Sequence, residues 1–490
     1  MSEHVGSPVT ERPVRKRNIV GFGLGDIYGG GAFLIVGMLF MFYMTEVVHM
    51  KPVLAGLMFG LGKAFDGVAD PLMGFLSDRT RSRAGRRRVY FLWGIVPIAL
   101  TFALIWVPIR SDSQALLFTY YFVAFLLLNA TLTMVMTPYS ALPAEMSSDF
   151  TVRNSLSTSR LIFSGLSSLI AAVVPKLLID AFPADPGKGH LAMGIAFGLL
   201  FALPWIVVYK STWENDKHRE IVKGENFLRE FARIFRNRSF RIHILMYIFA
   251  YTAMDVLMAL FTYYLTYYIG RPGIYSITMG TLMVAQLAVM PFYGRLASRK
   301  GPGIPYTLGL LVWAGGMVAL TLAVGPGSAL ALIAAVSALI GMGTSAGVLI
   351  PYVILPFVID VDELMTGEQR SGVYAGAMTL LRKLVQGLLA MPAIGLMLQG
   401  IGFVPNAVQS HETLSRFVVF FIGAPGLLIV CGILAATRFR ITPKTHAILK
   451  AELGRLRAGG ARAAVDDESR RVCELLSGVA YTDCRLGTGD

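Results

Sequence analysis

The sequence predicts an all-α membrane protein, because it is apolar overall, poor in charged residues and divided into long apolar segments. Of its 490 residues, 55% are hydrophobic and 15% are charged, and the mean hydropathy is +0.61. A soluble globular chain carries about 25% charged residues. Twelve apolar stretches have lengths that suit membrane-crossing helices: 27–47, 54–76, 88–108, 115–137, 158–183, 190–209, 242–269, 275–297, 304–324, 328–357, 372–400 and 415–437.

The net charge of +14 follows a membrane topology rather than a nucleic-acid interface. Loop 78–88, linker 209–241 and tail 438–490 hold six, nine and ten Lys or Arg residues. The loops on the opposite side contain Lys51, Arg110, Lys188 and Arg271. Cytoplasmic loops of membrane proteins carry such an excess of basic residues. We therefore expect a multi-pass protein of the cytoplasmic (inner) membrane, with both termini in the cytoplasm, bilayer contact and no nucleic-acid partner.

A charged linker separates the twelve stretches into two sets of six. Two six-helix halves related by a repeat, joined by a cytoplasmic linker, are typical of the major facilitator fold. The predicted parts are a cytoplasmic N-terminal tail 1–26, six-helix bundles 27–209 and 242–437, a linker 210–241 and a cytoplasmic tail 438–490. Short basic loops follow the second and eighth stretches, and we expect them to gate the protein through Gly74, Asp78, Arg79, Gly294 and Arg299.

Helices are also expected outside the membrane. Apolar residues at helical spacing predict an amphipathic helix over 227–236, lying at the membrane surface. The tail predicts helices over 443–457 and 468–477, and a glycine stop follows the first. The three cysteines, Cys431, Cys473 and Cys484, imply no disulfide framework.

The second apolar stretch carries two acids and a base. Asp66 and Asp70 are four residues apart, so on a helix their directions differ by about 40°. Lys63 lies on the same face. An ionised side chain at membrane depth costs several kcal/mol unless it is paired or faces water. This pattern predicts a cation-coupled transporter, although Asp66 paired with Lys63 is also compatible with a purely structural role.

Other functional classes fit the sequence less well. The seven histidines are scattered, and we find neither a metal-ligand spacing nor a nucleophile or phosphate-binding motif, so no enzyme activity and no cofactor are expected. A channel needs a continuous polar lining, whereas these stretches contain isolated acids. A sensor would need an output domain, which the tail does not resemble. We expect a monomer that binds a small-molecule substrate.

Motifs in both halves resemble those of one transporter family. The run Asp66-Gly-Val-Ala-Asp70-Pro71 is followed by Gly74 and by a basic loop, Pro138–Ala144 ends the fourth stretch, and Asp360–Lys383 forms a C-terminal signature. This combination resembles the glycoside–pentoside–hexuronide:cation symporter family over residues 21–400. The resemblance implies the major facilitator fold and alternating-access symport.

The resemblance also implies roles for individual residues. Asp66 and Asp70 match the acids that coordinate the coupling cation, Na⁺ or H⁺, and they would be the metal ligands if the ion is Na⁺. Thr133 matches a hydroxyl near that site. Lys63 and Lys383 match basic residues that serve as charge partners of the acids.

The substrate cavity is expected near the first, fourth, seventh, tenth and eleventh stretches. Sugar-binding acids of the family fall at Gly30 and Met136 in this chain, so polar positions have become small or apolar. The sequence therefore predicts symport of a glycoside or similar small organic solute, with a lysophospholipid or another amphiphile as the alternative. The candidate cavity residues are Asp26, Gly30, Met136, Tyr139, Asp255 and Tyr352.

Overall fold

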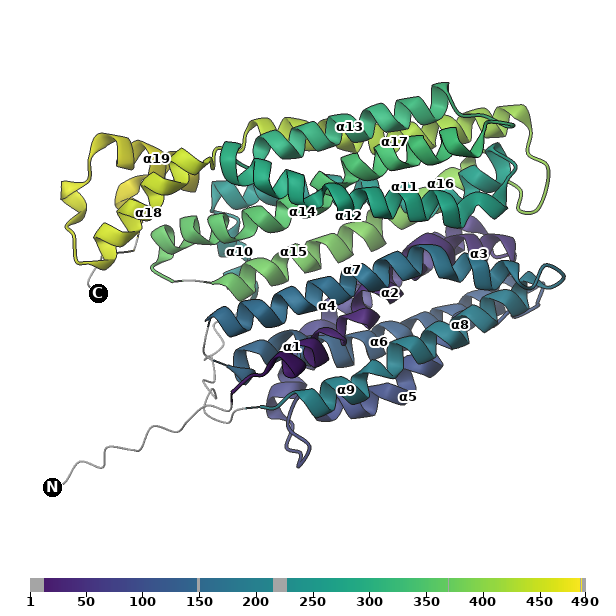
Figure 1. The fold of residues 1–490 in the computed structure, drawn as a ribbon, viewed down its shortest axis with the longest axis horizontal. Coiled ribbons are helices and arrows are strands. Elements are labelled where there is room, and N and C mark those ends of the chain that lie inside the picture. Colours follow the sequence, from purple (N-terminus) through teal and green to yellow (C-terminus); the bar gives the residue numbers. More distant parts are fainter. Residues whose placement is uncertain (1–12, 148–149, 215–226, 369, 485, 487–490) are drawn as a thin grey trace. The chain divides into compact units, whose positions relative to one another are not determined.

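A computed structural model of the chain describes residues 13–147, 150–214, 227–368, 370–484 and 486, and these form helices and connecting loops without a β-strand (Figure 1). A helix satisfies its own backbone hydrogen bonds, which a membrane interior demands. Before the linker, the helical elements are α1 (Lys16–Gly23), α2 (Asp26–Ile35), the π-helix η1 (Val36–Phe40), α3 (Met41–Glu46), α4 (Pro52–Arg79), α5 (Val89–Leu104), α6 (Gln114–Met146), α7 (Phe150–Asp180), α8 (Pro186–Ala202) and α9 (Pro204–Ser211).

The second part of the chain is also helical and ends in a helical tail. Its elements are α10 (Phe227–Ile234), α11 (Arg238–Tyr263), the π-helix η3 (Tyr264–Tyr268), η4 (Pro272–Ile274), α12 (Tyr275–Lys300), α13 (Gly303–Leu322), α14 (Leu330–Thr366), α15 (Ser371–Val385), the π-helix η5 (Gln386–Ala390), α16 (Met391–Gly400), α17 (His411–Thr437), α18 (Pro443–Arg457), η6 (Arg462–Ala464), α19 (Asp467–Ser477) and η7 (Tyr481–Asp483).

All twelve predicted apolar stretches fall on helices. Within the described residues, eleven helical segments are long and apolar enough to cross a membrane, and the stretch at 88–108 corresponds to the shorter apolar helix Val89–Leu104. The first of these helical segments begins at Lys16, ahead of the predicted apolar stretch 27–47. Its early part is tightly packed: a Cβ atom on Gly21 or Gly23 would lie 2.1–2.2 Å from a serine Oγ of α9 or α7. Asp26 lies within this helical segment, as the first residue of α2.

The chain divides into two compact units that do not coincide with the two sequence halves. Unit 1 contains Met1–Val36, Val68–Ser111 and Ala115–Ile221, and unit 2 contains Gly37–Gly67, Asp112–Gln114 and Val222–Asp490. Helix α4 thus passes from unit 2 to unit 1 between Gly67 and Val68. The domain boundaries predicted from the sequence remain predictions.

In unit 1, small residues allow helices to approach one another closely. A Cβ on Gly30 would lie 2.5 Å from Ser164 Oγ, and one on Gly31 would lie 2.3 Å from Ser167 Oγ, so α2 and α7 are in backbone contact. Ser167 Oγ donates a hydrogen bond of 2.7 Å to the carbonyl of Ile27. Small residues at such contacts are a common basis of helix association in membranes, where no hydrophobic driving force separates helix from lipid.

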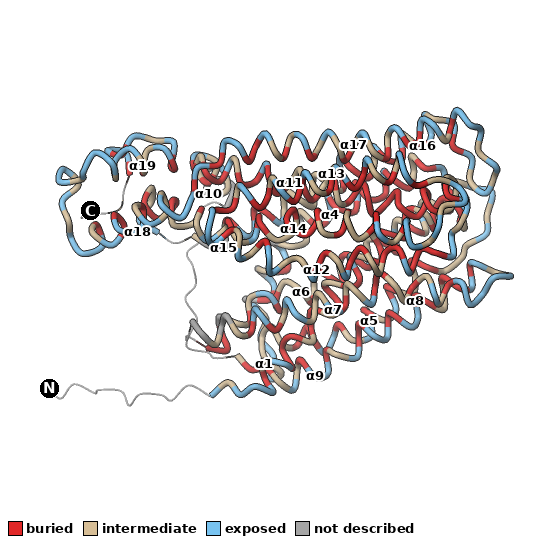
Figure 2. The backbone as a smooth tube through the Cα atoms, turned by 45° about the horizontal axis from the view of Figure 1, so that its top comes forward, coloured by how far each residue is buried: buried red, intermediate tan, exposed pale blue. Residues whose placement is uncertain are grey.

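In unit 2, α14 packs between α12 and α13 through glycines. A Cβ on Gly341 would lie 2.1 Å from the carbonyl oxygen of Leu282, and one on Gly343 would lie 2.3 Å from the backbone nitrogen of Trp313. Both clashes are with backbone, which cannot rotate away. Buried residues accordingly run along the inner faces of these helices, as Figure 2 shows in red.

The tail folds into the two predicted helices, and it packs on unit 2. Helix α18 begins at a capping box formed by Thr442 and Thr445, and α19 begins at Asp466, which accepts a hydrogen bond from the backbone of Ser469. Arg457 pairs with Glu363 of α14, and Ser239 Oγ of α11 donates to the carbonyl of Leu476 at 2.6 Å. The predicted linker helix is also present, as α10.

The glycine contacts of α14 give a first prediction. Replacing Gly343 with Ala places a methyl group against the Trp313 backbone, so the free energy of unfolding should fall by about 1–3 kcal/mol. The matched control is Gly315→Ala on α13, where a Cβ meets no atom within 4 Å. Thermal unfolding of the detergent-purified variants measures both, and equal stability of the two would contradict the proposed backbone contact.

The tail gives a second prediction. Burial raises the pKa of Cys473 to about 12 and that of Cys484 to about 11. The thiolate is the reactive form, so at pH 8 the folded protein should react with iodoacetamide more slowly than the denatured one, roughly a hundredfold at Cys484 and roughly a thousandfold at Cys473. Mass spectrometry of the alkylated peptides gives the rates. Rapid labelling of native protein would mean that the tail does not adopt this buried packing in solution.

Candidate functional site

Asp66 lies in unit 2 on α4 and is 1% exposed. Its Oδ2 atom contacts two ammonium groups, Lys63 Nζ at 3.1 Å and Lys383 Nζ at 3.6 Å. Its Oδ1 atom is also buried, and no hydrogen-bond donor reaches it from the part of the chain that the structure describes. One oxygen of this carboxylate is thus strongly paired, while the other keeps its acceptor capacity.

Close contact between α4 and the segment formed by α15, η5 and α16 brings these charges together. A Cβ on Gly387 in η5 would lie 2.2 Å from Lys63 Cβ, and one on Gly60 would lie 2.9 Å from the carbonyl oxygen of Gly387. Gly56 meets the carbonyl of Met391 in the same way, at 2.8 Å. Sequence reasoning missed this contact, although Gly56 and Gly60 form the G-x-x-x-G spacing that signals close helix packing.

Asp70 is one helical turn from Asp66 and belongs to unit 1. It is half-buried, and Thr133 Oγ1 of α6 donates a hydrogen bond of 2.7 Å to its Oδ1 atom. Thr133 itself is 3% exposed. Each of the two predicted cation-binding acids is therefore held by side chains of its own unit, Asp66 by lysines and Asp70 by a hydroxyl group.

Two predicted cavity residues, Asp26 and Tyr139, meet in unit 1 around Arg160. Asp26 Oδ1 pairs with Arg160 Nε at 3.1 Å, and the guanidinium carbon lies 5.1 Å from the centroid of the Tyr139 ring. The Tyr139 hydroxyl donates to the carbonyl of Phe22 at 2.7 Å. Sequence reasoning missed Arg160, although an arginine within the apolar stretch 158–183 is itself a signal of function or pairing.

Gly30 and Met136 occupy packed positions in unit 1. The absence of a side chain at Gly30 lets α7 approach α2, as described above, so an acid could not fit at this position without moving a helix. A Cβ on Gly29 would lie 2.6 Å from the Met136 Cε atom, so the methionine covers the neighbouring surface of α2. Both positions thus take part in helix packing within unit 1.

The other two predicted cavity residues, Asp255 and Tyr352, lie in unit 2 around Arg382. Arg382 Nη2 of α15 contacts Asp255 Oδ1 of α11 at 3.5 Å. The guanidinium carbon of Arg382 stands 4.3 Å above the Tyr251 ring. Tyr352 of α14 is 52% exposed, and its ring lies 6.0 and 6.3 Å from those of Tyr247 and Tyr251. Sequence reasoning found the acid and the aromatic residue, but it assigned no role to Arg382.

The predicted gating residues lie near helix ends. Gly74 and Arg79 are in the last turns of α4, and Gly294 and Arg299 are near the end of α12, with both arginines exposed. The side chain of Asp78 lies outside the described residues. In unit 1, the loop after α4 is fixed by two glutamates that sequence reasoning missed. Glu214 accepts hydrogen bonds of 2.8–2.9 Å from the backbone amides of residues 86–88, and Glu145 pairs with Arg86 at 2.5 Å.

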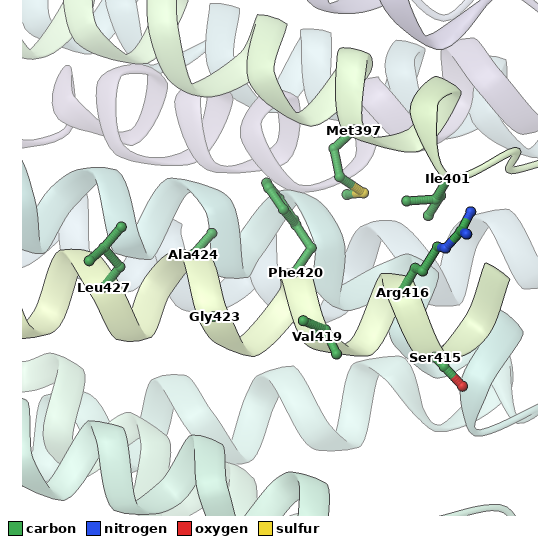
Figure 3. A pocket seen from close by; sticks show the side chains of 9 residues that line it. All are labelled: Met397, Ile401, Ser415, Arg416, Val419, Phe420, Gly423, Ala424 and Leu427. Carbon is green, nitrogen blue, oxygen red and sulfur yellow. The ribbon is translucent and has the colours of Figure 1, made fainter. Parts of the chain in front are cut away.

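A separate pocket of about 620 Å³ lies between α16 and α17 (Figure 3). Its lining is largely apolar, with Phe420 and Met397 in the middle and Arg416 at one end, and it contains none of the predicted site residues.

No group of three or more His, Cys, Asp or Glu side chains within the described ranges could hold a metal ion.

Comparison with known proteins shows which family the chain is similar to. The family described as "MFS/sugar transport protein" matches residues 21–443. Similar proteins include an uncharacterized symporter of Synechocystis sp. (26% identical; 88% of this chain and 95% of that protein are covered) and a putative glycoside/cation symporter of Escherichia coli K12 (24%; 91% and 96%). A putative sulfoquinovose importer of the same bacterium is 24% identical, with 92% and 96% covered.

Solved structures share the fold at low sequence identity. A bacterial homologue of the human lysosomal transporter Spinster, inward-facing and occupied, superimposes with a TM-score of 0.66 at 12% identity, covering 90% of this chain and 98% of that one. A D-xylose–proton symporter superimposes with a TM-score of 0.60 at 15% identity, covering 86% and 96%.

The major facilitator fold predicted from the sequence is confirmed, and so is the resemblance to the glycoside/cation symporters. The protein is a multi-pass membrane transporter and not an enzyme. The family match extends over most of the described chain and ends where α18 begins. The chain belongs to the MFS/sugar transport protein family.

Proposed function

We propose that this protein is a cation-coupled symporter that moves a sugar-like solute across the inner membrane by alternating access. Its similarity to a putative glycoside/cation symporter and a putative sulfoquinovose importer supports a sugar-like solute. The excess of Lys and Arg in loop 78–88, the linker and the tail supports an orientation with both termini in the cytoplasm.

The proposal rests on the Asp66 carboxylate, whose two oxygen atoms have different surroundings. A purely structural ion pair would use both oxygens, because a buried acceptor without a donor costs about 1–3 kcal/mol. Asp66 instead leaves Oδ1 without a donor among the described residues, while Oδ2 contacts two lysines. Such an oxygen can accept a proton directly or become one ligand of a Na⁺ ion, which prefers oxygen donors.

The lysines then act as the exchangeable counter-charge. When no coupling cation is bound, Lys63 and Lys383 keep the Asp66 carboxylate neutralised, so that it does not stand as an isolated charge in a low-dielectric environment. When a proton or Na⁺ binds, the attraction that holds the ammonium groups weakens. Asp70, oriented by Thr133, supplies a second carboxylate one turn along the same helix. Cation binding is thereby linked to the contact between α4 and α15.

Gating would take place at the ends of α4 and α12, where Gly74, Arg79, Gly294 and Arg299 lie. Charges at these helix ends can form ion pairs in one conformation and release them in the other. The substrate would bind at the polar side chains near the middle of the spans. A lysophospholipid is the alternative solute, and a competition experiment separates it from a glycoside.

The coupling role of Asp66 gives a third prediction. Asp66→Asn removes the charge that attracts the cation while nearly preserving the volume of the side chain. We expect solute accumulation driven by an imposed Na⁺ or proton gradient to fall at least tenfold in proteoliposomes, while solute exchange at equilibrium continues. Applying each gradient separately identifies the ion.

The matched control for this experiment is Asp180→Asn, which removes an exposed acid paired with Lys176 at the end of α7. Methyl glycosides and lysophosphatidylcholine serve as competing solutes in the same vesicles. Gradient-driven accumulation that survives in Asp66→Asn would contradict the proposal and leave Asp66 with a structural role.

The counter-charge role of Lys383 gives a fourth prediction. Lys383→Met removes one ammonium group from Asp66, so the protein should lose about 1–3 kcal/mol of stability without cation. Its stabilisation by the coupling cation should in turn exceed that of the wild type, because a competitor of the cation is gone. Thermal unfolding across Na⁺ concentration and pH measures both effects. Lys176→Met is the control, and an unchanged cation dependence in Lys383→Met would refute the counter-charge role.

A further inference from the structure

Arg382 of unit 2 is held by a longer ion pair than Arg370 of the same unit. Its ion pair with Asp255 is 3.5 Å long, and its Nε atom is buried without a hydrogen-bond partner among the described residues. Arg370 instead binds Asp362 through both Nε and Nη2, at 2.9 and 2.5 Å. Arg457 likewise uses two nitrogens on Glu363. Arg370 and Arg457 thus each bind a carboxylate through two nitrogens, which Arg382 does not do with Asp255.

The surroundings of Arg382 are suited to a ligand. Its guanidinium lies over the face of Tyr251, an arrangement that fixes the plane of the group. The side chain is 35% exposed, so part of the fork remains accessible. Beside it stands Tyr352, the exposed member of a cluster of three tyrosines. An exposed aromatic ring next to a partly paired guanidinium offers one apolar face and one cationic fork.

We propose that Arg382 is a specificity-determining residue that binds an oxyanion on the transported sugar, a carboxylate or a sulfonate. The inference rests on the proposed symport function and assigns the substrate class to that function. The guanidinium donates hydrogen bonds to two oxygens of the anion, a geometry that a lysine cannot reproduce. Asp255 keeps the guanidinium in place, and the ring of Tyr352 contacts the apolar face of the pyranose.

Arg382 and Lys383 are adjacent in the sequence, but their side chains contact different partners. Adjacent residues on a helix project about 100° apart. Lys383 accordingly contacts Asp66, whereas Arg382 contacts Asp255 and Tyr251. A neutral sugar would leave the accessible donors of Arg382 to water, and an anionic sugar would complete the pairing that Asp255 leaves unfinished.

The test compares three pyranosides that differ only at C6: methyl glucoside, methyl glucuronide and methyl sulfoquinovoside. Binding to purified full-length protein is measured by isothermal titration and by thermal stabilisation. We expect the wild type to prefer at least one of the two anions over the glucoside by about tenfold to a hundredfold, which is the usual value of hydrogen bonds to a charged group. The anion that binds more tightly shows whether the site prefers a carboxylate or a sulfonate.

Arg382→Gln should abolish this preference by weakening the binding of the two anions, and Arg382→Lys should restore part of it. The matched control is Arg416→Gln, which changes an exposed arginine of the same unit. Equal binding of all three sugars by the wild type, no binding of any of them, or an unaltered preference in Arg382→Gln would each overturn the inference. If Arg382→Gln does not fold, Arg382→Lys decides, because loss of the two-pronged geometry should still reduce the preference several-fold.

Failure of this inference is distinguishable from failure of the proposed function. The cation dependence of binding is measured in parallel on Asp66→Asn. An anion preference without any cation dependence would support the role of Arg382 and refute cation coupling. Cation dependence without an anion preference would support cation coupling and refute the role of Arg382.

Discussion

The arrangement of unit 2 depends on one constraint, that the buried carboxylate of Asp66 must be neutralised. An isolated charge in a membrane-spanning helix would have a large free-energy cost, and the two lysines that contact Oδ2 offset most of it. One lysine comes from the same helix and the other from a residue more than 300 positions away. The segment formed by α15 and η5 must therefore lie directly against α4. Gly60 and Gly387 make that contact possible because glycine has no side chain. Charge pairing and backbone packing are two parts of one requirement.

Local patterns in the sequence were sufficient to predict the helices and the acid face. The spacing of Lys63, Asp66 and Asp70 predicts one helical face, and the tail helices begin and end close to the predicted residues. Residues 16–26 also belong to the first helical segment, ahead of the predicted apolar stretch 27–47. Their glycines are buried against serines of α7 and α9, and hydropathy carries no information about such partners.

The contacts that sequence reasoning could not supply join residues distant in the chain. Arg160 with Asp26, and Arg382 with Asp255, each connect two helices whose register is set by packing. A charged residue in an apolar stretch indicates that a partner exists, but not which one. Lys383 was named in advance only through resemblance to a family, whereas Arg382, one position earlier, was not. The departures at Gly30 and Met136 have a physical reason in unit 1, since both positions are filled by helix packing.

The neighbouring positions 382 and 383 suggest how the cation and the solute are coupled. In the proposed mechanism, Lys383 loses attraction to Asp66 when the cation binds, and α15 then has one fewer contact with α4. Arg382 is on the same turn of α15, so a small displacement of that helix alters its contact with Asp255, which at 3.5 Å is already long. A bound oxyanion would hold the guanidinium in its new position. Each ligand would thus favour the same state of α15, and reciprocal coupling of two binding sites requires nothing more than such a shared preference.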